Sequence, residues 1–114
     1  MGLPRPLRLA RSEDFARLRR EGQTFRGRFM LLNIAPNTLS HNRYGLVTSK
    51  RLGGAVVRNR VRRLIREGLR QVTPTLTAGW DVVLVAHPSI VGQPLAEIMR
   101  AFDALARQSG LLTP

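Results

Sequence analysis

Hydrophobic and polar positions recur along the chain at spacings that predict both helices and strands. Apolar residues return at helical intervals in residues 55–72 and 94–108, whereas residues 80–86 form a short, nearly continuous apolar run. The first pattern is typical of helices with one buried face, and the second of a strand buried on both faces in the centre of a sheet. We therefore expect two long helices with a central strand between them.

The N-terminal half predicts a shorter helix followed by three strands. Ser12 precedes two acidic residues, which is typical of a helix start, and Gly22 is a natural helix end. A first, weakly defined strand is expected at Thr24–Phe25, and clearer strands at residues 29–35 and 43–49. The whole chain then has the order α-β-β-β-α-β-α.

This order predicts an α+β fold, an α/β sandwich in which helices pack on one sheet. With 114 residues and no internal repeat, low-complexity tract or linker, residues 1–114 are expected to form a single domain. Residues 1–11 are basic and interrupted by prolines, and we expect them to be a flexible basic arm.

Basic residues are concentrated in the first part of the chain. The sequence has 19 Lys and Arg against 7 Asp and Glu, a net charge of +12, and seventeen of the bases lie in residues 1–70. A one-sided field of this kind is expected on a surface that meets a polyanion. All bases but one are arginine, whose planar fork suits phosphate groups and stacks on bases.

Several classes of protein are disfavoured by what the sequence lacks. Without cysteine there is no disulfide scaffold and no thiolate metal site. The absence of a signal-peptide pattern and of a bilayer-spanning stretch leads us to expect a cytoplasmic protein that binds no membrane. His41 and His87 are far apart in sequence, and no carboxylate pair or nucleophile arrangement is apparent. We expect neither a catalytic residue nor a protein-bound metal.

The helix expected over residues 55–72 carries its charge on one side. Opposite its apolar face lie Asn59, Arg62, Arg63, Arg66 and Arg70, with Arg58 and Arg60 at the two edges. Solvated faces normally mix charges of both signs, because opposite charges four residues apart stabilise a helix. Here only Glu67 can neutralise an arginine locally, which favours a nucleic-acid-binding face over a merely solvated one. The preceding Gly53 and Gly54 either form a turn or let backbone amides approach a phosphate.

A longer run around this helix resembles a known family signature. Residues 49–67 read Ser-Lys-Arg-Leu-Gly-Gly-Ala-Val-Val-Arg-Asn-Arg-Val-Arg-Arg-Leu-Ile-Arg-Glu, which closely resembles the bacterial ribonuclease P protein family, including its Arg-Asn-Arg core. Such a signature is long and specific, unlike a lone glycine motif. The resemblance extends through Glu13-Asp14-Phe15, Gly22, residues 25–29 and 44–47, and Trp80–Ala86, and so covers nearly the whole chain up to the final helix.

The resemblance implies a fold with an unusual left-handed βαβ crossover, formed by the third strand, the arginine helix and the last strand, against the right-handed rule. It implies a protein subunit of the endonuclease that removes the 5′ leader of precursor tRNA, with the catalytic Mg²⁺ organised by the RNA subunit. No cofactor is then expected on the protein itself. The expected partners are ribonuclease P RNA and the precursor tRNA leader.

The resemblance also implies two groups of site residues. The group expected to bind the RNA subunit is Lys50, Arg51, Arg58, Asn59, Arg60, Arg62, Arg63, Arg66 and Arg70. The group expected to line a leader cleft between sheet and helices is Phe15, Arg19, Arg28, Ser49 and His87. A base would stack on Phe15 at roughly 1–3 kcal/mol, but a Phe on the apolar side of a short helix is equally typical of a core residue.

Three cleft positions depart from the family pattern. Arg19 and Asn33 stand where aromatic residues are common, and His87 stands where an arginine often follows the last strand. Leader binding is therefore expected to depend more on arginine and less on stacking. Two other functions fit the basic helix: a structural RNA-binding protein of the ribosomal type, or a DNA-binding regulator that uses the helix in a major groove. The strand content disfavours the regulator.

Overall fold

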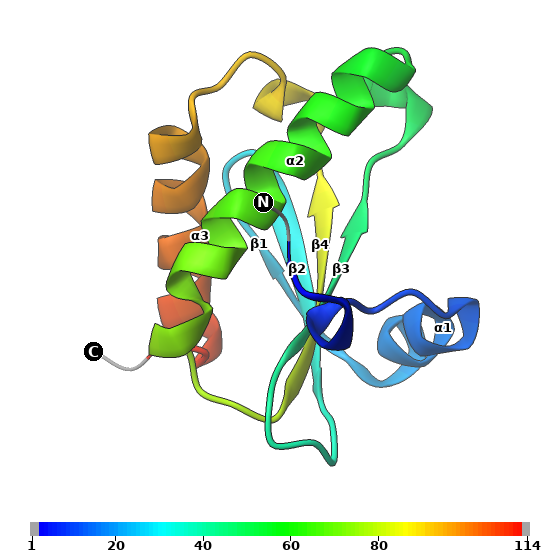
Figure 1. Cartoon of the computed structure of the whole chain (residues 1–114), viewed down its shortest axis with the longest axis vertical. Helices are drawn as coiled ribbons and strands as arrows, with labels where there is room; N and C mark the ends of the chain where they lie inside the picture. The colour runs from blue at the N-terminus through cyan, green and yellow to red at the C-terminus, as the bar shows by residue number, and fades with distance from the viewer. Residues whose placement is uncertain (1–2, 113–114) are drawn as a thin grey trace.

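The computed structural model describes residues 3–112, which form three α-helices and one four-stranded sheet (Figure 1). The helices are α1 (Ser12–Glu21), α2 (Ala55–Val72) and α3 (Leu95–Ser109), and the strands are β1 (Gln23–Arg26), β2 (Met30–Pro36), β3 (Arg43–Val47) and β4 (Trp80–Ala86). Short 3-10 helices lie in the connections at Arg5–Leu7, Lys50–Leu52, Thr73–Thr75 and Pro88–Ile90. The α+β fold and the element order predicted from the sequence are confirmed.

The sheet has the strand order β1-β2-β4-β3, so that β4 lies between two neighbours. β2 runs antiparallel to β1 and β4, whereas β3 runs parallel to β4 and forms an edge. In this register Leu84 of β4 lies opposite Leu32 of β2 and Leu46 of β3. The central position of β4 explains its apolar run, because five of its seven residues are buried.

β3, α2 and β4 form a crossover between two adjacent parallel strands. In Figure 1 both strands run upward, α2 lies in front of them, and the chain passes from β3 to β4 on its left. A right-handed connection seen from this side would move to the right, so the crossover is left-handed. The handedness that the family resemblance implied is therefore found in the structure.

The two faces of the sheet are covered unequally. α2 and α3 pack on one face and enclose the larger core, whose fully buried members include Leu32, Ile34, Ile65, Leu69, Leu84, Ile98, Phe102 and Leu105. On the other face α1 places Phe15 and Leu18 over Ala35 and Val83, at one end of the strands. Toward the opposite end, Val85 on this face stays half-buried. The second face is therefore only partly closed by protein.

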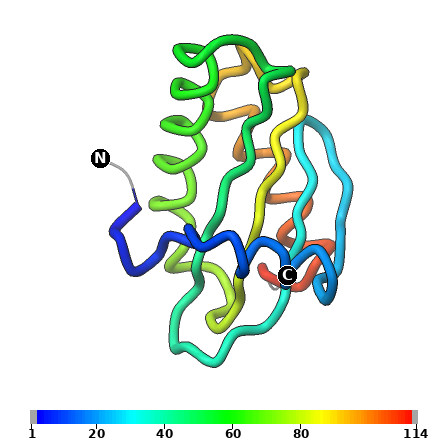
Figure 2. The backbone as a smooth tube through the Cα atoms, turned by 90° about the vertical axis from the view of Figure 1, so that its right-hand side faces the viewer, coloured from blue at the N-terminus to red at the C-terminus, as the bar shows by residue number. Residues whose placement is uncertain are grey.

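The N-terminal segment packs on the molecule over its described part, residues 3–11. Leu3 and Leu9 are only 2% and 5% exposed, and the Leu9 amide donates a hydrogen bond to the Tyr44 oxygen of β3 at 2.8 Å. Figure 2 shows the segment crossing the β3 edge from the α2 side toward α1. The segment is therefore not the flexible arm expected over residues 1–11. It packs because the open edge of β3 offers unpaired backbone groups and because the leucines of the segment are buried against apolar side chains. Residues 1 and 2 lie outside the described part.

Candidate nucleic-acid interface

The outward face of α2 forms one wall of a basic hollow. Val61, Ile65 and Leu69 are buried against the core, which turns the intervening side chains toward solvent. Residues three and four apart share a helix face, so the outward positions lie side by side. The hollow has a volume of about 330 Å³ and is lined by Arg8, Asn59, Arg62, Arg63 and Arg66. Four of the nine residues expected to bind the RNA subunit therefore meet here, together with one arginine that sequence reasoning missed.

The arginines of this hollow have no neutralising acid beside them in the described part of the chain. Arg62 donates hydrogen bonds to the Thr48 hydroxyl and to the Asn59 side-chain oxygen. Among residues 3–112, no carboxylate forms an ion pair with any arginine that lines the hollow. Burial, followed by the charges of Arg8 and Arg62, lowers the pKa of Arg66. The hollow therefore concentrates positive charge, as a site for an anionic ligand requires.

The remaining arginines expected on α2 lie outside the hollow. Arg58 is half-buried, and its Nε is enclosed without a hydrogen-bond partner in the described part of the chain. Arg60 lines a separate depression of about 160 Å³, together with apolar side chains of α2 and residues 90–93. Arg70 pairs with Glu67 in the last turns of the helix, and this hydrogen bond lowers the pKa of the Glu67 carboxyl. The charge of α2 is thus most concentrated around the hollow.

The two glycines before α2 form the turn into the helix. Gly53 has a φ of 136°, in the left-handed region that favours glycine, and its amide donates to the Lys50 oxygen at 3.1 Å. Gly54 then precedes the first residue of α2. The turn interpretation accounts for Gly53, whereas an approach of these amides to a phosphate stays a prediction.

A second hollow, of about 380 Å³, lies on the open half of the other sheet face. It is lined by Arg26, Gly27, Met30, Leu31, Ser49, Arg51, Val85, Ala86, His87 and Pro88. Ser49 and His87, both expected to contact the leader, are brought together here. Arg51 joins them, although the sequence assigns it to the RNA-subunit group, and Lys50 is exposed beside it in the same 3-10 turn. The imidazole Nδ1 of His87 accepts a hydrogen bond from the Ser89 amide at 3.1 Å.

Phe15, Arg19 and Arg28 do not line this second hollow. Phe15 is half-buried over Gly45, where a Cβ atom would lie only 2.6 Å from the ring. Phe15 and the half-buried Val85 both pack against the smaller core, and Val85 also lines the hollow, so this core connects Phe15 with that space. Arg19 is exposed on α1, and the guanidinium of Arg28 lies 4.9 Å from the ring centre of Phe29. Phe15 thus combines a core contact with partial exposure.

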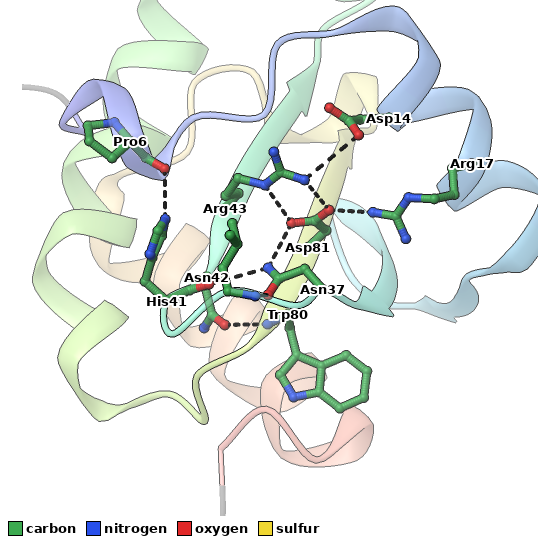
Figure 3. Close-up of polar contacts among 10 residues, drawn as sticks. Pro6, Asp14, Arg17, Asn37, His41, Asn42, Arg43, Trp80 and Asp81 are labelled. Carbon is green, nitrogen blue, oxygen red and sulfur yellow. Dashed lines mark hydrogen bonds and ion pairs between the residues drawn. The ribbon is translucent and has the colours of Figure 1, made fainter.

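A buried ionic cluster around Asp81 was not found by sequence reasoning (Figure 3). Asp81 of β4 is 0% exposed and accepts two hydrogen bonds from Arg43 of β3, at 2.9 and 2.7 Å. Asn37 donates to the same carboxylate at 2.9 Å, and Arg17 of α1 pairs with it. Asp14 of α1 lies 3.7 Å from Arg43. The cluster therefore ties α1, which carries Phe15, to the centre of the sheet.

The partners of Asp81 decide its protonation state. Burial alone would raise the pKa of Asp81, but hydrogen bonds from Arg43 and Asn37 and the nearby positive charges outweigh it and leave this pKa lowered. The hydrogen bond to Asp81 in turn raises the pKa of Arg43. One signal in the sequence could have revealed the cluster: Asp81 is the only charged residue of an apolar strand, and a buried charge needs partners.

Residues 3–112 contain no group of three His, Cys, Asp or Glu side chains that could hold a metal ion. None of the helices in this range is long and apolar enough to cross a bilayer. That the chain contributes no catalytic residue and binds no metal itself stays a prediction.

The fold and the basic hollow define the class of protein: a small basic α+β protein whose arginine-rich helix lies in a left-handed βαβ crossover over a mixed sheet. The chain belongs to the ribonuclease P protein family: the family model described as Ribonuclease P matches residues 3–110. It is 43% identical over 109 residues to the ribonuclease P protein component of Chloroflexus aurantiacus (strain J-10-fl), covering 95% of this chain and 81% of the relative. It is 38% identical over 111 residues to that of Roseiflexus sp. (strain RS-1), covering 96% and 91%.

Solved structures of the family share the fold. The chain superposes on the Staphylococcus aureus RNase P protein with a TM-score of 0.85, at 23% identity and covering 94% of this chain and 98% of the other. For the Thermotoga maritima protein the TM-score is 0.82, at 21% identity and covering 89% and 96%. With the family established, the function predicted from the sequence is confirmed: the protein is a subunit of ribonuclease P, an endoribonuclease of tRNA processing.

Proposed function

We propose that this subunit assists the catalytic RNA in removing the 5′ leader of precursor tRNA by binding two RNA segments on different surfaces. The basic hollow on α2 binds the RNA subunit, and the open face of the sheet binds the leader. The observation that carries the proposal is the convergence of four arginines on one hollow without a carboxylate partner among the described residues. The metal ions of the reaction are assigned to the RNA subunit, as the family resemblance implies.

The α2 surface suits a folded RNA whose phosphates lie close together. Each phosphate neutralised by an arginine releases counterions, so an array of guanidinium groups gains affinity from every contact. The hydrogen bonds of Arg62 to Thr48 and Asn59 orient its fork before RNA binds, which reduces the side-chain entropy lost on binding. These features favour an RNA-docking surface over a solvated helix face.

The open sheet face suits a single-stranded RNA segment. Leu31 and Val85 offer half-buried apolar surface against which bases can pack, while Arg51 and Arg26 lie at the same hollow and can meet phosphates. Phe15 of α1 packs against the same small core as Val85. The chain therefore supports leader binding that combines apolar packing with arginine contacts.

Reconstitution with a bacterial ribonuclease P RNA tests the proposal. The chain alone is expected to cleave no precursor tRNA, and it should restore cleavage by the RNA at low magnesium. A variant with Arg62→Ala, Arg63→Ala and Arg66→Ala should fail to restore cleavage at the same protein concentration, whereas the control Arg100→Ala with Arg107→Ala on α3 should succeed. Cleavage by the RNA that is unchanged when the chain is added would contradict the proposal and favour the structural RNA-binding alternative.

A further inference from the structure

Arg8 lies 41 positions before the start of the family signature at Ser49, yet it completes the basic hollow on α2. We propose that Arg8 and the arginines of α2 form a two-sided clamp for a backbone phosphodiester of RNA, which makes the N-terminal segment part of the RNA interface. This inference rests on the proposed function of α2 and adds a second structural element to it. Neither the spacing nor the charge pattern of the helix indicates this role for Arg8.

Arg8 is fixed in place by the fold rather than by the ligand. Its Nε donates to the backbone oxygen of Leu3 at 2.7 Å, and its backbone forms a parallel bridge with Tyr44 on the β3 edge. Leu3 and Leu9, on either side, are buried. Figures 1 and 2 both place this segment beside α2. The guanidinium of Arg8 therefore faces the α2 arginines across the hollow before any RNA is present.

The electrostatics of the hollow call for an anion between its two walls. The charges of Arg8 and Arg62 contribute to lowering the pKa of Arg66, which means that these groups repel one another in the free protein. A phosphodiester has two non-bridging oxygens, so one can accept from Arg8 while the other accepts from an α2 arginine. Binding then replaces repulsion across the hollow with two charge-assisted contacts.

The lining of the hollow selects RNA backbone rather than a base. All five lining residues are polar and none is aromatic, so a base could stack only on the guanidinium planes, whereas a phosphate can meet several guanidinium groups at once. The volume of about 330 Å³ leaves room for a phosphate with its flanking sugars. The clamp should therefore contribute affinity without sequence preference, as phosphate contacts generally do.

Binding of the full-length chain to ribonuclease P RNA over a range of salt concentrations tests the clamp. Arg8→Gln should weaken binding and reduce the slope of log affinity against log salt by about one unit, the value for one lost phosphate contact. The matched control is Arg5→Gln, which removes the same charge from an exposed position of the same segment outside the hollow. That control should leave the slope unchanged.

Two further variants separate charge from packing and the clamp from the proposed function. Arg8→Lys also loses the Nε contact to Leu3 but keeps the charge, so it should retain the slope. The clamp would be overturned if Arg8→Lys lowered the slope as much as Arg8→Gln does. It would also be overturned if Arg5→Gln and Arg8→Gln lowered the slope equally. Arg62→Ala serves as the reference: a reduced slope for Arg62→Ala with an unchanged slope for Arg8→Gln refutes the clamp alone, and unchanged slopes for both refute the proposed function as well.

Discussion

Replacing the buried Asp81 by asparagine tests how α1 is held on the sheet. The substitution keeps the shape of the side chain and an acceptor for Asn37, but removes the charge that Arg17 and Arg43 share. Breaking a buried ion pair typically costs about 3–5 kcal/mol, because a charge is left uncompensated. Here the Arg17 and Arg43 side chains are 27% and 24% exposed and regain some water, so we expect a loss of about 2–4 kcal/mol.

This loss is a large part of the free energy of unfolding, since small domains are stable by only about 5–15 kcal/mol. Its pH dependence follows from the lowered pKa of Asp81. A carboxyl with a lowered pKa contributes its stabilisation fully above its ordinary pKa of about 3.9 and loses it as the pH falls through the folded value. The free energy of unfolding of the two proteins should therefore differ most near neutral pH and converge in acid.

Urea unfolding at pH 7 and at steps below pH 4 measures both effects. The control is Asp103→Asn, which removes a carboxylate from an exposed i, i+4 pair with Arg107 and should cost less than about 1 kcal/mol. The reasoning would be refuted if Asp81→Asn unfolded within 0.5 kcal/mol of the parent at pH 7, about the size of an ordinary surface substitution. A difference that stays constant into acid would also refute it.

Two further predictions concern the open sheet face. Phe15→Leu should lower the affinity of the holoenzyme for precursor tRNA with a leader but not for tRNA without one, because Leu preserves apolar packing but cannot stack on a base; equal effects on both ligands would show that Phe15 is only a core residue. Arg51→Ala should likewise weaken binding of the leader-bearing substrate, because Arg51 lines the second hollow, and should leave affinity for the RNA subunit near the parent value. Separate titrations of the two ligands check this. A selective loss of RNA-subunit affinity would instead place Arg51 in the RNA-subunit group that the sequence assigned.

Much of the fold could be predicted because local patterns decide it. The apolar periodicity of residues 55–72 matches α2, and the apolar run of residues 80–86 matches β4. The packing of residues 3–11 could not be predicted in the same way, since leucines separated by prolines and arginines follow neither helical nor strand spacing and their partner is a distant sheet edge. The left-handed crossover came from family resemblance, because general rules favour the opposite hand.

The candidate site was predictable where one helix face carries it. Asn59, Arg62 and Arg66 follow helical spacing, so their meeting could be foreseen. Arg8 could not be foreseen, because it reaches the hollow only through the course of the N-terminal segment. The Asp81 cluster joins residues 38 and 64 positions apart in sequence, beyond the reach of any local pattern.

In this account, ribonuclease P RNA docks on the arginine-lined face of α2. The salt dependence of RNA binding tests this docking most directly. Affinity of the parent chain, Arg62→Ala and Arg63→Ala for ribonuclease P RNA would be measured across salt concentrations, with Arg107→Ala on α3 as control. We expect each α2 substitution to lower the slope by about one unit and the control to leave it unchanged. If both α2 variants showed the same slope as the parent chain, the account would be contradicted, and these arginines would be an ordinary solvated surface.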